Sequence, residues 1–331
     1  MYKTFYNLRV NPFEITPDPS FLFSTPHHNE ALASLYYGVR TRKGFVVLTG
    51  EVGTGKTLLV RCVLELLRRT GVSFAYVFNP SLSALEFVRY IAGDFGLPVA
   101  GKAKDEIILS LSSFLLDRHQ RKLSTLLVVD EAHLLKPELL EEIRLLTNLE
   151  TTQQKLLQIV LAGQPELDQM LDSFELRQLK QRIALRCHLE PLNEQETAGY
   201  IQRRLQIAGA PSGMVFSELA AEAIYRHSRG FPRTINTLCE NALLSGYARR
   251  ADIIPAEIVD EVANDLRLGV ISRPEDKAVS AATTKEQEKD ELLRAVKTLL
   301  ELHDYLQEMK TLEAKETTTG LRGTIKHEPY I

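Results

Sequence analysis

One stretch near the N-terminus decides the fold: Phe45-Val-Val-Leu-Thr-Gly50-Glu-Val-Gly-Thr-Gly-Lys56-Thr57. Its apolar beginning predicts a strand over residues 45–49, and the apolar spacing that follows predicts a helix over residues 56–70. The glycines between them let the backbone curl until its N–H groups face phosphate oxygens, and the helix N-terminus adds a positive dipole. The pattern G-x-x-x-x-G-K-[ST] in this context predicts a phosphate-binding loop.

We expect this loop to bind ATP together with Mg²⁺. Lys56 is expected to reach the β- and γ-phosphates, and the Thr57 hydroxyl is expected to ligate the metal ion. A chance glycine-rich turn would not bring a strand, a lysine, a hydroxyl and a helix in this order. The residues expected to contact the nucleotide are Gly50, Glu51, Val52, Gly53, Thr54, Gly55, Lys56, Thr57 and Leu58.

A second apolar run, Leu126-Leu-Val-Val-Asp130-Glu131, ends in two carboxylates. Alone, it would be better explained as a strand capped by solvated acids. Downstream of a phosphate-binding loop, it predicts the strand that completes the metal site. We expect Asp130 to hold Mg²⁺ and Glu131 to act as general base on the attacking water. The sequence therefore predicts an ATPase.

The same run continues as Asp130-Glu-Ala-His133, a tetrad found in helicases. Such helicases need a second nucleotide-gripping α/β domain, and the region after residue 193 is short and helical in pattern. The helicase interpretation is therefore set aside, and His133 is expected to start a helix.

Three further polar residues, Gln164, Arg182 and Arg233, are candidates for catalysis at a shared site. Gln164 leaves a predicted strand beside the two carboxylates and could orient the water, although a plain strand-to-turn residue is an equal alternative. Arg182 is our choice for a finger that reaches a neighbouring subunit's γ-phosphate, with Arg177 and Arg186 as alternatives. Arg233 opens a predicted helix, where its charge opposes the helix dipole unless an anion such as a phosphate compensates it.

The organisation of the chain follows from its apolar pattern. Nearly continuous apolar runs at residues 45–49, 73–78, 125–130, 156–162 and 185–189 alternate with helical patterns. This predicts a five-stranded parallel sheet that is buried on both faces. We expect an α/β nucleotide-binding domain with an N-terminal leader over residues 1–192, an all-helical lid over 193–270, a linker over 271–285, and a tail helix with a flexible end over 286–331.

The tail helix carries an apolar seam at alternating spacings of four and three residues, formed by Leu292, Val296, Leu299, His303 and Leu306. Such a seam is typical of a short coiled coil. A helix that packs on its own ATPase domain explains it equally well.

Composition restricts the class of protein. The chain has 331 residues, 44% of them hydrophobic and 25% charged, with a net charge of −3. This composition excludes a mainly disordered chain and a disulfide scaffold. A net charge near zero also means that the protein as a whole is not attracted electrostatically to nucleic acid. No apolar window is long enough for a membrane-spanning helix, and the N-terminus lacks an apolar signal core. The expected location is the cytoplasm.

Together, these motifs resemble those of AAA+ ATPases: Walker A, Walker B, a sensor-1-like Gln164, the finger candidate Arg182, and Gly-x-Pro-Arg233 as sensor 2. More closely, the chain resembles the ATPases of the ExeA, GspA and MshM type, which are linked to type II secretion, type IV pili and exopolysaccharide export. The likeness covers roughly residues 1–268. It rests on the phosphate-binding loop and on Tyr6-Asn-Leu-Arg-Val-Asn-Pro-Phe13, Pro17-Asp-Pro, Phe21-Leu-Phe23, His28-Asn-Glu-Ala-Leu32, Ala162-Gly-Gln-Pro-Glu-Leu167, Gln181-Arg-Ile183 and Leu189-Glu-Pro-Leu192.

The resemblance implies a P-loop domain with a helical lid and a nucleotide held between the two. It implies ATP hydrolysis that drives assembly or remodelling of an envelope-export partner, with peripheral association at the inner membrane through that partner. Arg182 of one subunit would face the site of the next, which implies a ring or filament. The chain departs from ExeA in lacking a membrane helix and a periplasmic peptidoglycan-binding domain, so those roles are not carried over.

Two alternatives remain. A DNA-binding AAA+ protein of the transposition type, similar to TnsC or TniB, shares this core. It would need a basic stripe, for which Arg61, Arg68, Arg69 and residues 118–122 are candidates, although the net charge weakens the case. A nucleotide switch without hydrolysis is the other alternative, and Glu131 argues against it.

Overall fold

The computed structural model describes residues 1–78, 82–152, 154–210 and 215–268. The predicted linker over 271–285 and the predicted tail helix with its apolar seam lie outside these residues. Among the described helices, none combines the length and the apolar character needed to cross a membrane. The three cysteines, Cys62, Cys187 and Cys239, are free thiols.

The predicted five-stranded parallel sheet is confirmed. Its strands lie in the order β2-β3-β4-β1-β5, and every neighbouring pair is parallel. The inner strands β1, β3 and β4 are buried at every residue, whereas the edge strands β2 and β5 are partly exposed. The strands are β1 (Phe45–Gly50), β2 (Ser73–Val77), β3 (Thr125–Val129), β4 (Leu157–Gly163) and β5 (Ile183–Leu189).

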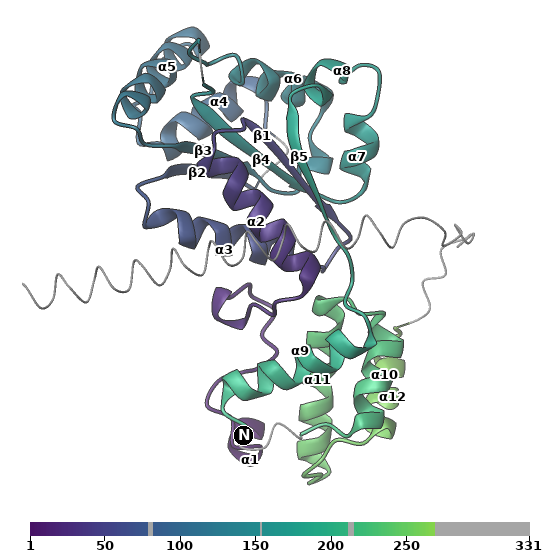
Figure 1. The fold of residues 1–331 in the computed structure, drawn as a ribbon. Helices are drawn as coiled ribbons and strands as arrows, with labels where there is room; N and C mark the ends of the chain where they lie inside the picture. Colours follow the sequence, from purple (N-terminus) through teal and green to yellow (C-terminus); the bar gives the residue numbers. More distant parts are fainter. Residues whose placement is uncertain (79–81, 153, 211–214, 269–331) are drawn as a thin grey trace, which may run out of the picture. The chain divides into compact units, whose positions relative to one another are not determined.

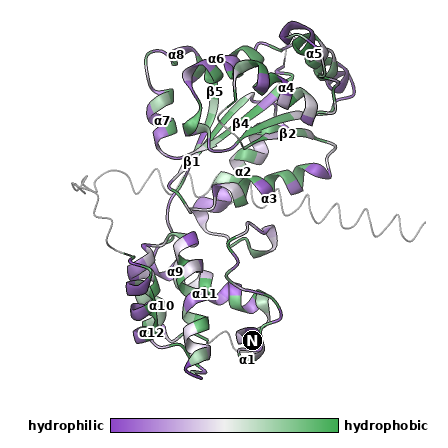
Figure 2. Cartoon of the chain, turned by 180° about the vertical axis from the view of Figure 1, so that it is seen from behind, coloured by the Kyte–Doolittle hydropathy of each residue, from purple (hydrophilic) through white to green (hydrophobic). Residues whose placement is uncertain are grey.

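Helices cover both faces of the sheet (Figure 1). Successive side chains of a strand point to opposite faces, so Phe45 and Val47 of β1 join one core while Val46 and Leu48 join the other. The strands are accordingly apolar and the outward helix surfaces polar (Figure 2). Helices α2 (Pro26–Arg40) and α3 (Lys56–Arg68) cover one face, and α4 (Ala84–Asp94), α5 (Lys104–Gln120), α6 (Pro137–Leu146), α7 (Glu166–Leu171) and α8 (Arg177–Lys180) cover the other.

Helices α7 and α8 were not predicted. They occupy the connection between β4 and β5, and with six and four residues they are too short to show a helical period in the sequence. Three other short helices are α1 (Tyr2–Phe5), η1 (Pro19–Phe21) and η2 (Ala132–Leu134).

After β5 the described chain is helical and has a core of its own. Tyr6, Leu8 and Phe13 of the N-terminal leader are buried in this helical core. The leader therefore contributes aromatic side chains to the helices that follow the sheet. These helices are α9 (Glu194–Ala208), α10 (Glu218–Ser228), α11 (Pro232–Ala248) and α12 (Ala256–Asp265).

One glycine fixes the path into α11. Gly230 has φ of +77°, and a Cβ atom there would lie 1.8 Å from the carbonyl oxygen of Leu192. The backbone N–H of Leu192 also donates to the carbonyl oxygen of Gly230 at 2.9 Å. Only glycine accommodates both the positive φ and this close backbone approach.

We expect Gly230→Ala to lower the free energy of unfolding by about 2–4 kcal/mol, since it adds a backbone clash to the strain of the left-handed conformation. Gly96 is the matched control, because its φ is +80° and a Cβ there would meet nothing within 4 Å. Gly96→Ala should therefore lower the free energy of unfolding by about 1 kcal/mol, the cost of the left-handed backbone conformation alone. Urea unfolding measures both values. Equal losses would show that the approach of Leu192 does not constrain the fold.

Candidate functional site

The glycine-rich loop between β1 and α3 encloses a lysine. Gly53 and Gly55 have φ of +83° and +102°, which lets the loop curl around the start of α3. Lys56 is 7% exposed, and its Nζ donates to the carbonyl oxygens of Gly50 and Glu51 at 2.8 and 3.0 Å. Burial lowers the pKa of Lys56, while nearby carboxylates act against this shift. The loop thus holds a desolvated cation at the position where the sequence predicts phosphates.

A hydroxyl and a carboxylate meet beside this loop. Thr57 Oγ1 donates to Asp130 Oδ2 at 2.9 Å, and the Tyr76 hydroxyl donates to the same oxygen at 2.7 Å. Burial and the Asp130 carboxylate raise the pKa of Tyr76, which stays a donor. Tyr76 was missed by the sequence analysis. The sequence feature that could have identified it is a tyrosine hydroxyl near the carboxyl end of β2, the strand that pairs with β3.

These oxygen donors fit Mg²⁺, which prefers one or two protein ligands together with substrate phosphates. No group of three or more His, Cys, Asp or Glu side chains that could hold a metal ion occurs in the described part of the chain. A site built from Thr57 and Asp130 is therefore consistent with a metal ion that arrives with a nucleotide.

Glu131 has a special backbone conformation and a polar neighbour. Its φ is +51°, uncommon for a residue with a side chain, and its backbone N–H donates to Asp130 Oδ1 at 2.9 Å. Glu131 Oε2 lies 3.5 Å from His133 Nδ1, and His133 Nε2 lies 2.8 Å from Gln164 Nε2. His133 belongs to the short helix η2, in line with the expected helix start, but it also links Glu131 to Gln164. The sequence analysis did not predict that link.

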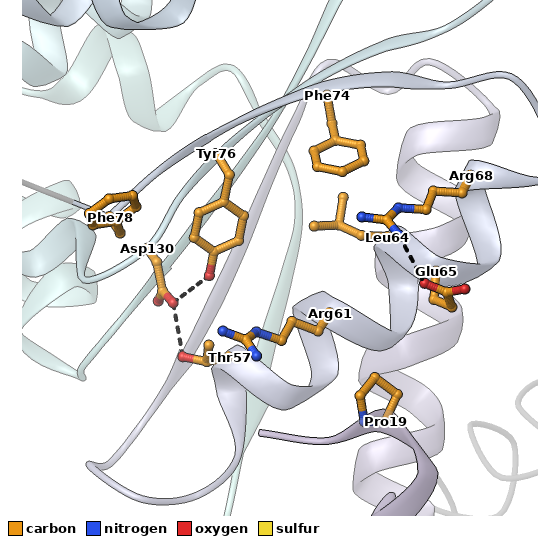
Figure 3. A pocket seen from close by; sticks show the side chains of 10 residues that line it. All are labelled: Pro19, Thr57, Arg61, Leu64, Glu65, Arg68, Phe74, Tyr76, Phe78 and Asp130. Atoms are coloured by element: carbon orange, nitrogen blue, oxygen red, sulfur yellow. Dashed lines mark hydrogen bonds and ion pairs between the residues drawn. The ribbon is translucent and has the colours of Figure 1, made fainter. Parts of the chain in front are cut away.

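Six of the predicted loop residues and three of the four catalytic candidates line one cavity of about 440 Å³, whereas Asp130 lines a neighbouring pocket of about 510 Å³ that shares Thr57 with it (Figure 3). Thr54 does not line it, since its hydroxyl donates to the carbonyl oxygen of Glu51 and supports the loop. Gly50 and Glu51 are also outside the lining, although their carbonyl oxygens hold Lys56. The predicted residues that line the cavity are Val52, Gly53, Gly55, Lys56, Thr57, Leu58, Glu131, Gln164 and Arg233.

Arg233 joins the helical region to the loop. It lies in the first turn of α11, and its backbone N–H donates to the carbonyl oxygen of Gly53 at 3.2 Å. A Cβ atom on Gly53 would lie 2.8 Å from Arg233 Cβ, so this glycine permits the contact. The start of α11 therefore lies directly against the phosphate-binding loop.

The three candidate finger arginines lie outside this cavity. Arg182 Nη1 donates to the carbonyl oxygen of Arg144 at 3.0 Å and to Thr147 Oγ1. Arg186 forms ion pairs with two aspartates near α7. Arg177 stacks on Phe174, with 4.1 Å between the guanidinium carbon and the ring centroid. None of them contributes to the site of its own chain.

The lining of the cavity also contains a buried arginine that the sequence analysis missed. Arg204 of α9 is 4% exposed, and its guanidinium carbon lies 4.9 Å from the Phe21 ring centroid and 5.1 Å from that of Tyr200. Its Nη1 is 3.5 Å from the carbonyl oxygen of Glu14, and its Nε has no hydrogen-bond partner among the described residues. Burial lowers the pKa of Arg204. The available signal was an arginine on the apolar face of a predicted helix.

Comparison with known proteins agrees with this geometry. A family model described as an AAA domain matches residues 39–171. General secretion pathway protein A of Aeromonas hydrophila is 45% identical over 250 residues, which are 75% of this chain and 45% of that relative. The chain therefore spans less than half the length of this curated relative.

Two solved structures share the fold. The Aeropyrum pernix ORC2 protein, in ADPNP and ADP complexes, superposes with a TM-score of 0.59 at 18% identity, over 77% of this chain and 71% of that one. Cdc6p from Pyrobaculum aerophilum superposes with a TM-score of 0.60 at 18% identity, over 82% of this chain and 72% of that one. At such identities the likeness shows the fold alone.

Proposed function

Since the chain belongs to the AAA+ ATPases, of the type represented by general secretion pathway protein A, we propose that it binds ATP with Mg²⁺ in the 440 Å³ cavity and hydrolyses it. One observation carries the proposal. The glycine-rich loop brings together three groups of side chains: the buried Lys56, the metal-ligating pair Thr57 and Asp130, and the contact series Glu131, His133 and Gln164. Phosphate release from ATP by the full chain tests it, and a chain that neither binds nor hydrolyses ATP would reject it.

Each residue has a distinct role in this proposal. The backbone N–H groups of the loop and Lys56 bind the β- and γ-phosphates. Thr57 and Asp130 hold Mg²⁺, which neutralises charge on the phosphate oxygens. Glu131 accepts a proton from the attacking water, and Gln164 orients that water. Arg233 contacts the phosphates from α11, so that nucleotide binding tightens the contact between the helical region and the loop.

We propose that Arg204 binds the nucleoside end of ATP. Arg204→Met keeps an unbranched apolar side chain but removes the charge and the donors. ATP affinity should fall about tenfold to hundredfold, because a hydrogen bond from a charged donor is lost. The unfolding temperature without nucleotide should stay the same or rise, because a buried cation without a carboxylate partner is removed.

A lower ATP affinity together with an unchanged or higher unfolding temperature would show that Arg204 binds the ligand and does not serve only to stabilise the fold. Thermal unfolding with and without Mg·ATP measures both, since ligand binding to the native state raises the unfolding temperature. Arg203→Met is the matched control on the exposed side of α9 and should change neither value. Destabilisation by Arg204→Met with unchanged ATP affinity would assign Arg204 to the core alone.

We further propose that ATP turnover drives assembly or remodelling of a partner in an envelope-export system. The name of the relative supports this, together with the high identity over three quarters of the chain. In the same proposal the chain works in the cytoplasm, beside the inner membrane through that partner. It self-associates so that Arg182 of one copy faces the nucleotide of the next, which is consistent with the absence of Arg182 from its own cavity.

Two of the arginines predicted for a DNA-binding stripe, Arg68 and Arg118, are engaged within the chain. Arg118 donates to the carbonyl oxygens of Gly71 and Ser124, and Arg68 pairs with Glu65. Side chains engaged in this way are less able to follow a phosphate backbone. These contacts count against Arg68 and Arg118 as parts of a basic stripe, and we keep the DNA-binding AAA+ ATPase of the transposition type as the alternative to the export role.

A further inference from the structure

A buried histidine lies beside the phosphate-binding loop and has no role in the proposed mechanism. His28 of α2 is 7% exposed, and it does not line the 440 Å³ cavity. It opens the segment His28-Asn-Glu-Ala-Leu32, to which the fold has so far given no function. Helix α2 packs against α3 on the same face of the sheet (Figure 1), and this places the His28 ring against the loop that precedes α3.

Both ring nitrogens of His28 have a partner. Nδ1 lies 2.8 Å from Thr25 Oγ1, and Nε2 lies 3.4 Å from the carbonyl oxygen of Thr54. The backbone N–H of His28 donates to the same Thr25 hydroxyl oxygen at 3.2 Å. Thr25 is the N-cap residue of α2 and is 3% exposed, so the ring is held by the fixed start of a long helix.

These partners determine which ring nitrogen carries the proton. Burial lowers the pKa of His28, so at pH 7 the ring is neutral, and one nitrogen donates while the other accepts. A carbonyl oxygen can only accept, so Nε2 is the nitrogen that donates to Thr54. The Thr25 hydroxyl then donates to Nδ1, while its oxygen accepts from the backbone N–H of His28. Every hydrogen in this series has an acceptor.

The carbonyl of Thr54 is the part of the loop that His28 contacts. The backbone N–H and the hydroxyl of Thr54 both donate to the carbonyl oxygen of Glu51, at 3.3 and 2.8 Å. Within the described part of the chain, His28 Nε2 is the only hydrogen-bond donor to the carbonyl oxygen of Thr54. A trans peptide bond places its C=O and N–H on opposite sides, so the N–H of Gly55 points away from His28.

The N–H of Gly55 is available to a ligand. It has no hydrogen-bond acceptor among the described residues, and Gly55 lines the cavity whereas Thr54 does not. Gly55 has φ of +102°, and glycine adopts both signs of φ, so its own conformational preference does not prevent rotation of this peptide. A rotated peptide would turn a carbonyl oxygen towards a bound phosphate in place of an N–H, and the two would repel each other.

We infer that His28 is a positioning residue of the phosphate-binding loop. Its Nε2–H holds the Thr54–Gly55 peptide in the orientation that presents the N–H of Gly55 to a nucleotide phosphate. The inference rests on the proposed binding of ATP at this loop, and it adds a residue that lies outside the cavity. His28 itself does not touch the nucleotide in this arrangement, so its replacement weakens phosphate binding without removing a ligand-binding group.

Calorimetry of Mg·ADP binding to the full chain tests this role. His28→Met removes the ring donor, and the dissociation constant should rise about tenfold, because the N–H that binds a charged phosphate oxygen is no longer held in place. His28→Gln should stay within about threefold of the parent, since its side-chain amide can donate from the position of Nε2. His27→Met replaces an exposed neighbour and is the matched control, which should bind like the parent.

The amide signal of Gly55 reports the orientation of the peptide directly. Threonine labelled with ¹³C at its carbonyl and glycine labelled with ¹⁵N select the four glycines that follow a threonine, namely Gly50, Gly55, Gly71 and Gly320. Thr54→Ser keeps the hydroxyl but removes the ¹³C label, so it identifies the Gly55 signal. At saturating Mg·ADP this signal should move downfield in the parent and in His28→Gln, and clearly less in His28→Met.

Two results with these variants would overturn the inference. One is a parent-like affinity and a parent-like Gly55 signal in His28→Met. The other is an equal loss of affinity in His28→Met and His28→Gln, because that pattern assigns His28 to packing alone. A parent that does not bind Mg·ADP would instead reject the proposed function.

The ring nitrogens of the parent provide a test that requires neither a variant nor a nucleotide. Among the eight histidines, His28 is identified in ¹⁵N spectra by its proximity to Thr25. At pH 7 its ring should carry a proton on Nε2 and none on Nδ1. The opposite tautomer, or a doubly protonated ring, would overturn the inference whether or not the chain binds ADP.

Discussion

Replacement of Glu131 by glutamine is expected to lower ATP turnover about 10²–10⁴-fold while ATP binding is preserved. The amide keeps the shape of the side chain, but it cannot accept a proton from water. Asp130 keeps its carboxylate and its hydrogen bond to Thr57, so the metal-ligating pair is unchanged. Glu131 has φ of +51°, and its Oε2 lies 3.5 Å from His133 Nδ1.

The matched control for this variant is Glu166→Gln. Glu166 is another carboxylate close enough to act on the pKa of Lys56, but among the described residues no hydrogen bond or ion pair joins its side chain to His133 or Gln164. Its replacement should change turnover only slightly. Parent-like turnover in Glu131→Gln would remove Glu131 from the mechanism, and a parallel loss in both variants would assign the effect to the local charge.

Lys56→Ala should lower ATP affinity at least about hundredfold, because phosphate loses its closest cation in a desolvated loop. Lys56 is buried, and its only hydrogen-bond partners among the described residues are two backbone carbonyl oxygens, so the variant removes a charge that costs solvation free energy in the absence of phosphate. The protein without nucleotide should therefore remain folded, with an unfolding temperature equal to or above that of the parent.

Thermal unfolding with increasing Mg·ATP measures this effect. The parent should be stabilised as ATP increases, and Lys56→Ala should not respond. Lys136→Ala, which replaces an exposed lysine before α6, is the control and should respond like the parent. An ATP-dependent shift in Lys56→Ala equal to that of the parent would place the nucleotide elsewhere.

Most of the fold could be predicted because its signals are local. Each inner strand is a nearly continuous apolar run, and the long helices repeat their apolar positions over several turns. Helices α7 and α8 could not be predicted, since they span less than two turns each. Their positions depend on the packing of Leu167, Leu171 and Leu179 against the sheet, which no local pattern specifies.

The residues of the candidate site also differ in whether the local sequence could predict their roles. The phosphate-binding loop is one contiguous segment, so its residue pattern points to its chemistry. The Asp130–Glu131 pair could be assigned because it ends an apolar run downstream of that loop. Tyr76 and Arg204 act through residues distant in sequence, and only the fold brings them to Asp130 and to the leader. His133 was noticed in the sequence because it ends the tetrad Asp130-Glu-Ala-His133. Its contact with Gln164 could not be predicted, because it depends on the pairing of β3 with β4.

The most direct test of the account is the identity of the nucleotide that each variant retains. The full chain, Glu131→Gln and Lys56→Ala are each incubated with Mg·ATP, separated rapidly from free nucleotide, and the bound fraction is resolved into ATP and ADP. We expect ADP on the parent, ATP on Glu131→Gln, and no nucleotide on Lys56→Ala. ADP on Glu131→Gln, or nucleotide retained by Lys56→Ala, would contradict it.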